Sequence, residues 1–212
     1  MKELIIVGAG GLGRELLQWI KAINNIAPKW IVKGFINDIP NTLDGLGCTH
    51  KILGTITNWQ PAPNEVFVCA IGNPKEKEKV VTLLKSKGAR FANIIHPTAI
   101  VGENNQIGEG LIMYPFARIT VNCTIGKFVT VLSSGIGHDS TIGDYSTISS
   151  GCVIAGYSKI GKRVYVGSNA TIIPKRNIED DVNIGAGSVV MTNIKKESKV
   201  MGNPARQFLP KN

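Results

Sequence analysis

Hydrophobic residues in the second half of the chain recur with a period of six. Isoleucine or valine stands at every sixth position from Ile136 to Val190, and the same spacing runs from Val101 to Val131 with Met113 among its members. One residue is missing between Val131 and Ile136. This period fits neither an amphipathic helix, with about 3.6 residues per turn, nor an alternating strand. It predicts a solenoid in which each hexad forms one short strand and one corner, so that three hexads close a triangular coil.

The other positions of each hexad support a solenoid. Glycine usually follows the repeat residue, as expected where the backbone turns tightly at a corner. Four residues after the repeat residue the side chain is small or apolar, which gives each hexad two inward positions for a narrow core. Sixteen repeat residues at three per coil predict about five coils, with strands about 4.8 Å apart. They are Val101, Ile107, Met113, Ile119, Ile125, Val131, Ile136, Ile142, Ile148, Ile154, Ile160, Val166, Ile172, Ile178, Ile184 and Val190.

The first 96 residues have the pattern of an α/β domain. Residues 4–7 form an apolar run typical of a buried strand, residues 8–13 read G-A-G-G-L-G, and a helix with one apolar face follows. A strand, a G-x-G-x-x-G turn and a helix in this order are typical of phosphate binding, because glycines permit close approach and a helix N-terminus favours an anion. The alternative is that the glycines serve only to pack the helix tightly against the strand.

The size of this domain limits its ligand. About 95 residues are roughly half of a dinucleotide-binding fold, which consists of two mononucleotide-binding halves. We therefore expect a mononucleotide-type ligand, and an NAD-dependent enzyme is disfavoured. Ligands of such sheets bind at the carboxyl ends of the strands. This rule selects Gly10, Gly11, Asp38 and Gly72 as candidate substrate-binding residues.

Composition excludes several classes of protein. No stretch approaches the ~20 apolar residues of a membrane span, and the N-terminus lacks the pattern of a secretory signal, so we expect a cytoplasmic protein without a membrane span. The four cysteines have no metal-type spacing and predict reduced thiols. A solenoid hydratase would need three histidine ligands that meet between coils, whereas His138 is the one histidine within them, so no metal is expected.

The charge of the chain is unevenly distributed. The net charge is +9, and residues 159–212 carry ten lysines and arginines against four acidic residues. Such a surplus suits an anionic, phosphate-bearing ligand. Nucleic acid is not expected as a partner, because no known nucleic-acid-binding module accompanies the basic residues. The alternative is that each of these side chains simply faces solvent.

Four motifs together resemble one known family: G-A-G-G-L-G-R-E at residues 8–15, I-I-H-P-T-A at 94–99, G-H-D at 137–139 and G-N-P-A-R at 202–206. Over essentially its whole length the chain is similar to the sialic acid O-acetyltransferase-like (NeuD/PglD-type) family of hexapeptide-repeat acyltransferases. The resemblance implies an α/β half-Rossmann domain at residues 1–96 that binds a nucleotide-linked sugar, and a left-handed parallel β-helix at residues 97–212. It also implies acetyl-CoA as the donor and a homotrimer with its active sites between neighbouring subunits.

The resemblance assigns roles to four residues of the solenoid. His138 matches the family's general base, and Asp139 matches the acidic residue that orients it. Imidazole, with an ordinary pKa of about 6.5, is suited to accept a proton from an attacking amine or hydroxyl near neutral pH. Gly156 matches the backbone amide that contacts the acetyl carbonyl, and Ala186 lies where the backbone lines the pantetheine channel.

Three basic residues are candidates for binding the phosphates of CoA. We select Lys175, Arg176 and Arg206 because of their charge and their place on the late coils. The chain also departs from its relatives in the short coil before His138, where Leu132-Ser133-Ser134 stand in place of Asn-Thr-Gly, and at Thr147, where some relatives carry a second histidine. Both departures concern the positioning of the acceptor.

The sequence leaves the reaction open between two acceptors. One hypothesis is N-acetylation of a nucleotide-linked amino sugar in the synthesis of bacterial surface glycans. The other is O-acetylation of sialic acid or a related sugar, with the same donor and the same base. The half-Rossmann domain favours the first hypothesis, because it offers a nucleotide a place to bind. A non-catalytic scaffold is disfavoured because His138 and Asp139 are both present.

Overall fold

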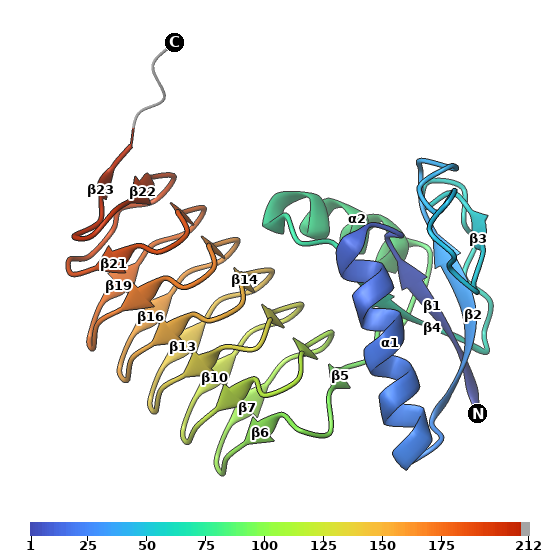
Figure 1. The fold of residues 1–212 in the computed structure, drawn as a ribbon, viewed down its shortest axis with the longest axis horizontal. Coiled ribbons are helices and arrows are strands. Elements are labelled where there is room, and N and C mark those ends of the chain that lie inside the picture. The colour runs from blue at the N-terminus through green and yellow to red at the C-terminus, as the bar shows by residue number, and fades with distance from the viewer. Residues whose placement is uncertain (209–212) are drawn as a thin grey trace. The chain divides into compact units, whose positions relative to one another are not determined.

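The computed structural model describes residues 1–208. It divides the chain into two units between Pro97 and Thr98, and each unit has its own architecture (Figure 1). Neither helix of the described chain is long and apolar enough to span a membrane.

The first unit is a parallel four-stranded sheet with the order β3-β2-β1-β4. The strands are β1 (Lys2–Val7), β2 (Trp30–Ile36), β3 (Ile52–Gly54) and β4 (Glu65–Cys69), and the helices are α1 (Gly11–Ile26) and α2 (Pro74–Ser86). A two-residue strand, β5 (Ile94–Ile95), ends the unit. The predicted strand–turn–helix at the start of the chain is confirmed. Upstream of β5, Phe91 makes only an isolated bridge to Phe67.

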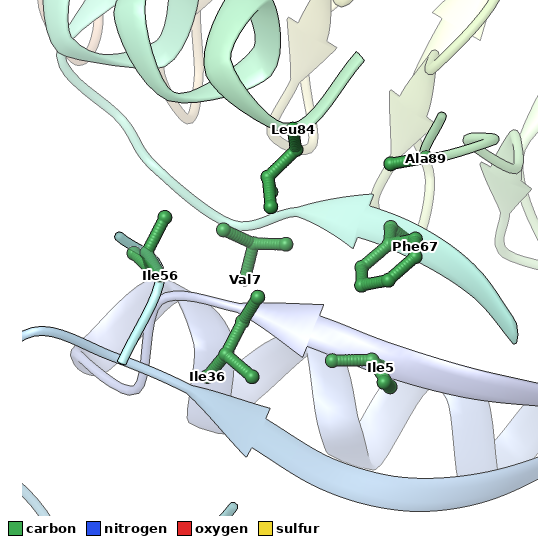
Figure 2. Packing of buried hydrophobic residues seen from close by; sticks show 7 residues of the cluster. All are labelled: Ile5, Val7, Ile36, Ile56, Phe67, Leu84 and Ala89. Carbon is green, nitrogen blue, oxygen red and sulfur yellow. The ribbon is translucent and has the colours of Figure 1, made fainter. Parts of the chain in front are cut away.

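One face of this sheet packs against α2. Val7 of β1, Ile36 of β2 and Phe67 of β4 are buried together with Leu84 of α2, and Figure 2 shows Leu84 directed toward Val7. The hydrophobic runs of β1 and β4 and the last three residues of β2 are buried, as expected for a sheet of this type. This core fixes the carboxyl ends of β1, β2 and β4, where the candidate binding residues lie.

The second unit is a parallel β-solenoid of short strands in three sheets. One sheet has the order β19-β16-β13-β10-β7 and another β21-β18-β15-β12-β9-β6, while the third runs from β22 through β20, β17, β14 and β11 to β8. The bounds are β6 (Ile100–Val101), β7 (Gln106–Ile107), β8 (Ile112–Met113), β9 (Arg118–Ile119), β10 (Thr124–Ile125), β11 (Thr130–Val131), β12 (Gly135–Ile136), β13 (Thr141–Ile142), β14 (Thr147–Ile148), β15 (Val153–Ile154), β16 (Lys159–Ile160), β17 (Tyr165–Val166), β18 (Thr171–Ile172), β19 (Asn177–Ile178), β20 (Asn183–Ile184), β21 (Val189–Val190), β22 (Lys199–Met201) and β23 (Arg206–Gln207).

The predicted repeat is confirmed residue by residue. Each of the sixteen repeat residues is the second residue of a strand from β6 to β21. They stack directly on one another between coils, as Ile125 does on Ile142 and Ile136 on Ile154. From Met113 onward each repeat residue is at most 2% exposed. The period of six therefore arises because the hexads from Met113 onward bury their repeat residues in the axial core.

The glycines that follow the repeat residues have a different role from the one expected. The left-handed backbone conformation occurs two residues later, three positions after the repeat residue, and is adopted there mostly by other residue types. The glycines are needed because adjacent coils lie very close: a Cβ on Gly108 would lie 2.6 Å from the carbonyl carbon of Gly126. The corner lies where it was predicted. The explanation for the glycines was wrong, because they allow adjacent coils to approach closely and do not make the turn itself.

The shortened coil before Ile136 loses its residue from a corner and not from a strand. Strands β11 and β12 keep their registers with the following coil. Ser133 takes the left-handed position with φ of 41°. Ser134 takes the buried inward position, and its hydroxyl accepts a hydrogen bond from the Cys152 amide at 2.9 Å. The core of the solenoid is therefore continuous across the missing residue.

Candidate active site

His138 and Asp139 lie on a corner that directly follows β12. The same edge of the solenoid carries Asn122 after β9, Gly156 and Tyr157 after β15, and Lys175 after β18. We call this edge the His138 edge. Successive coils are joined along it by backbone hydrogen bonds, from the Asp139 amide to the Val121 carbonyl, from Tyr157 to His138 and from Lys175 to Gly156.

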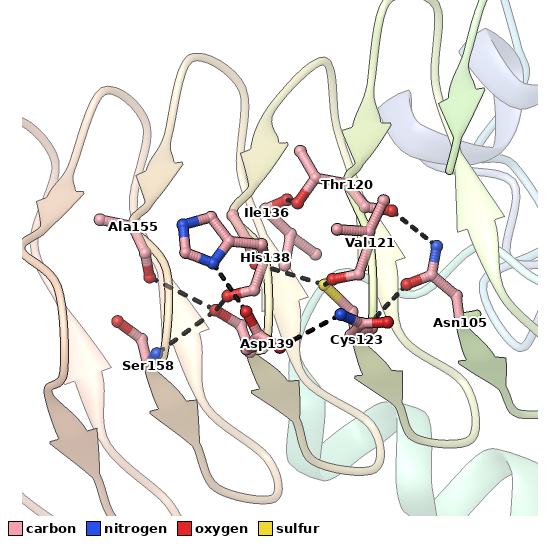
Figure 3. A network of polar contacts seen from close by, with 12 residues as sticks. Asn105, Thr120, Val121, Cys123, Ile136, His138, Asp139, Ala155 and Ser158 are labelled. Atoms are coloured by element: carbon pink, nitrogen blue, oxygen red, sulfur yellow. Dashed lines mark hydrogen bonds and ion pairs between the residues drawn. The ribbon is translucent and has the colours of Figure 1, made fainter. Parts of the chain in front are cut away.

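The imidazole of His138 is bound to Asp139 through one ring nitrogen. The distance between His138 Nδ1 and Asp139 Oδ2 is 2.8 Å, and His138 is exposed (Figure 3). When Nδ1 donates to the carboxylate, the neutral ring carries its lone pair on Nε2. Asp139 adopts a left-handed φ of 58°, which aspartate tolerates better than most residues. The pair therefore presents a proton acceptor at the surface of the corner.

A second hydrogen bond holds the carboxylate from the preceding coil. Asn122 Nδ2 donates to Asp139 Oδ1 at 3.3 Å. The hydrogen bond from His138 lowers the pKa of Asp139 below its ordinary value, and the bonds from Asn122 and Tyr157 lower it further. Asn122 was not predicted from the sequence. Its position 17 residues before Asp139, one shortened coil away, is the signal that could have found it.

Tyr157 confines the imidazole from the following coil. The two rings meet edge to face, with their centroids 5.1 Å apart and their planes at 89°. Such a contact is worth about 0.5–1.5 kcal/mol beyond area burial in other proteins. The ring of His138 is thus restrained by Asp139 on one side and Tyr157 on the other.

Gly156 lies directly beside the imidazole. A Cβ at this position would lie 2.7 Å from both Cε1 and Nε2 of His138, which is closer than such atoms approach. A Cβ at position 137 would lie 2.7 Å from the backbone nitrogen of Gly156, so only glycine fits there. Within residues 1–208 the Gly156 N–H has no hydrogen-bond acceptor. A backbone donor and a proton acceptor thus lie next to each other on one edge.

The other predicted residues of the solenoid lie in two places. Lys175 and Arg176 follow β18 on the His138 edge, and Arg176 Nε donates to the Pro174 carbonyl at 3.1 Å. Ala186 follows β20 on a different corner, and Arg206 belongs to β23, where it pairs with Met201. The described chain thus brings His138, Gly156 and Lys175 together and leaves Ala186 and Arg206 apart from them.

In the first unit, the candidate binding residues follow the carboxyl ends of neighbouring strands. Gly10 is the N-cap of α1 and supplies no side-chain cap to it. A Cβ at Gly10 would meet no atom within 4 Å, whereas one at Gly13 would collide with the Gly8 carbonyl oxygen. Tight packing therefore explains Gly13 but not Gly10, whose surroundings are open.

Asp38 and Gly72 complete this end of the sheet. Asp38 follows β2, and its carboxylate accepts a hydrogen bond from the Thr57 amide at 3.1 Å. A Cβ at Gly72 would lie 3.9 Å from Leu12 of α1. Across the described residues no group of three or more metal-ligating side chains has the arrangement of a metal site.

Comparison with known families gives two adjoining matches. The family model of the PglD N-terminal domain matches residues 3–84, and that of the GMPPB C-terminal domain matches residues 91–186. The GDP-perosamine N-acetyltransferase of Escherichia coli O157:H7 is 35% identical to the chain, over 96% of this chain and 95% of that protein.

Solved structures share the fold over nearly the whole chain. The acetyltransferase domain of PglB from Neisseria gonorrhoeae FA1090, in complex with acetyl coenzyme A, has a TM-score of 0.86 at 23% identity and covers 98% of this chain and 99% of its own. PerB from Caulobacter crescentus, in complex with CoA and GDP-perosamine, has a TM-score of 0.87 at 22% identity and covers 98% of both chains.

Proposed function

The chain belongs to the NeuD/PglD-type family of hexapeptide-repeat acyltransferases, and from this membership we propose that it transfers the acetyl group of acetyl-CoA to the amine of a nucleotide-linked amino sugar. The observation that carries the chemistry is the juxtaposition of a histidine proton acceptor with the N–H of Gly156, which has no acceptor within residues 1–208. The near full-length similarity to GDP-perosamine N-acetyltransferase supports a GDP-linked 4-amino sugar as the acceptor.

In the proposed reaction the amine nitrogen attacks the carbonyl carbon of the thioester. A C–N bond forms, and Nε2 of His138 takes the proton that the amine loses. The carbonyl oxygen becomes an oxyanion that accepts a hydrogen bond from the Gly156 amide. When the intermediate collapses, the C–S bond breaks, and the CoA thiolate leaves and takes up a proton.

Three neighbouring side chains hold the imidazole ring of His138 in one orientation. Asp139 fixes the tautomer in which Nε2 is the acceptor, Asn122 holds the carboxylate, and Tyr157 limits the rotation of the ring. Acetyl transfer from a thioester needs little beyond orientation and proton transfer, so holding the reacting groups in place accounts for much of the rate acceleration. On this basis we assign proton transfer to His138 and the orientation of its ring to Asp139.

The substrates would occupy different parts of the chain. Gly10, Gly11, Asp38 and Gly72 would bind the nucleotide, because open backbone at the carboxyl ends of parallel strands suits a phosphate-bearing ligand. Lys175 and Arg176 would attract the CoA phosphates. Ala186 and Arg206 stay candidates for the donor at a different place on the solenoid.

We further propose that the active form is a homotrimer in the cytoplasm. Apolar side chains beside the His138 edge are exposed in the single chain: Val121 by 41%, Val153 by 43% and Tyr157 by 53%. A neighbouring copy would cover them and wall the open site. Cys69, Cys123 and Cys152 are buried free thiols, which fits a reducing compartment.

The proposed function is tested by the release of free thiol from acetyl-CoA. GDP-perosamine, a UDP-linked 4-amino sugar and free sialic acid would be offered to wild type and to His138→Ala. We expect turnover with an amino sugar and a rate about 10²–10⁴ times lower in the variant, the usual contribution of general base catalysis. Turnover with sialic acid alone would replace the proposal by O-acetylation, and no turnover with any acceptor would refute it.

A further inference from the structure

A cavity of about 320 Å³ lies in the first unit between α1 and the loop that precedes β3. Its walls include Arg14, Gln18 and Lys21 from one face of α1, and Cys48 and Thr49 from the loop. The helical spacing places the three α1 side chains on one side of the cavity. The G-A-G-G-L-G-R-E motif includes Arg14, but it did not indicate a cavity, because the two walls of the cavity are far apart along the chain.

The cavity is cationic and contains no acidic residue among its lining. Arg14 is half-buried, and within residues 1–208 its guanidinium has neither a hydrogen-bond nor an ion-pair partner. Arg163 is different, since its guanidinium makes two hydrogen bonds of 2.8 Å to the carboxylate of Asp181. A partly buried cation without a counter-ion is costly, so the cavity favours an anionic ligand.

The other cation of the cavity reinforces this preference. Lys21 Nζ lies 3.4 Å from the Thr49 hydroxyl, and no carboxylate neutralises it among the described residues. Partial burial lowers the pKa of His50, the residue after Thr49, and the charge of Lys21 lowers it further. The positive potential of Lys21 thus reaches across the cavity to the loop.

The cavity begins where the glycine turn ends. Arg14 lies in the first turn of α1, and its Nη2 is 4.0 Å from the place of a Cβ on Gly11. A ligand that lies on the open backbone of Gly10 and Gly11 would therefore reach the guanidinium. A planar guanidinium can bind two phosphate oxygens at once, which suits it to a diphosphate.

We propose that this cavity binds the diphosphate of the nucleotide-linked sugar, with Arg14 as its main ligand and Lys21 as a second counter-ion. The proposal rests on the proposed function, because it takes the nucleotide sugar as the ligand. It adds two specificity-determining residues that lie outside the glycine turn and the strand ends.

Cys48 provides a reporter inside the cavity. It is half-exposed, whereas the other three cysteines of the chain are buried. The rate at which Ellman's reagent modifies Cys48 would be measured with and without GDP-perosamine, with Cys48→Ser as the background. We expect bound GDP-perosamine to slow this modification about tenfold or more, because a ligand that fills the cavity excludes the reagent.

Calorimetric titration with GDP-perosamine would be compared for wild type, Arg14→Gln and Lys21→Gln. Lys2→Gln removes an exposed charge of the same unit outside the cavity and is the matched control. We expect Kd to rise about tenfold or more for Arg14→Gln, from the loss of charge-assisted hydrogen bonds, and to stay unchanged for Lys2→Gln. An unchanged thermal midpoint of Arg14→Gln would exclude a loss of folding.

Two negative outcomes are distinguishable. If GDP-perosamine binds to wild type but neither protects Cys48 nor depends on Arg14, the cavity is not the diphosphate site, and the proposed function stands. If wild type binds acetyl-CoA but no nucleotide sugar, the proposed function and the cavity proposal both fail.

Discussion

The carboxylate of Asp139 is held by hydrogen bonds from two successive coils, through Asn122 and through its own neighbour His138. Because these bonds lower its pKa, Asp139 stays ionised in the folded protein at a pH where an unrestrained carboxyl would take up a proton. Its stabilising contribution is present above its ordinary pKa and is lost as the pH falls through the lowered value. Titration of Asp139 therefore lies well below the pH range in which a histidine base works.

The hydrogen bond between Asp139 and His138 predicts the behaviour of Asp139→Asn. An amide no longer fixes the tautomer in which Nε2 is the acceptor, and it does not stabilise the positive charge that the ring gains when it takes up a proton. We expect kcat/KM to fall about tenfold or more. Steady-state kinetics of the variant and wild type measure the difference. An unchanged kcat/KM would show that Asp139 does not act on His138.

Gly156 and Ala186 occupy the same position in their hexads, so the backbone there accepts a Cβ. At Gly156 the ring of His138 occupies that space. Gly156→Ala should displace the imidazole, lower kcat about tenfold or more and lower the thermal midpoint, because an overpacked contact costs roughly 1–3 kcal/mol.

A double variant separates this steric effect from others. In His138→Ala the obstructing ring is absent, so adding Gly156→Ala should lower the midpoint much less than it does in wild type. Equal losses in both backgrounds would mean that the cost comes from the backbone and not from the ring.

At the scale of elements, α2 buries a lysine against the sheet. Lys77 is 1% exposed, and burial lowers its pKa to about 7, while burial raises the pKa of Cys69 in β4 to about 11. Above pH 7 the unfolded chain holds a proton on Lys77 that the folded chain has lost, so the free energy of unfolding rises with pH. Cys69 opposes this rise only above about pH 8.5, where an unfolded thiol begins to ionise.

We therefore expect the free energy of unfolding of wild type to increase between pH 7 and pH 8. In Lys77→Met the increase should be smaller, because methionine has no titratable group. Urea denaturation of both proteins at the two pH values measures the difference. An equal increase of the free energy of unfolding in the two proteins would show that Lys77 does not titrate between pH 7 and pH 8.

For the whole molecule, the repeat residues predict the solenoid because every coil buries the same position. The strand–turn–helix of residues 4–26 was predicted because its hydrophobic pattern is local. Strand β3 was not predicted, because it has only three residues and a register shift against β2. Asn122 was missed for a related reason, and Arg14, although part of the G-A-G-G-L-G-R-E motif, was assigned no role. The roles of both depend on what lies beside them in space.

The antiparallel strand β23 pairs with β22 at the C-terminal end of one solenoid sheet. Every other solenoid strand of that sheet from β11 to β20 has a parallel neighbour on both sides. Without β23, the free backbone groups of β22 would form an open edge, to which the strands of another molecule could add. β23 is short and carries Arg206, two features that discourage further pairing.

A chain that ends at Ala205 should therefore self-associate through the edge of β22 at concentrations where the full chain does not. Light scattering would detect the larger species, and an unaltered size distribution would contradict the expectation. The reversal of one two-residue strand would then be what closes this end of the stack to another molecule.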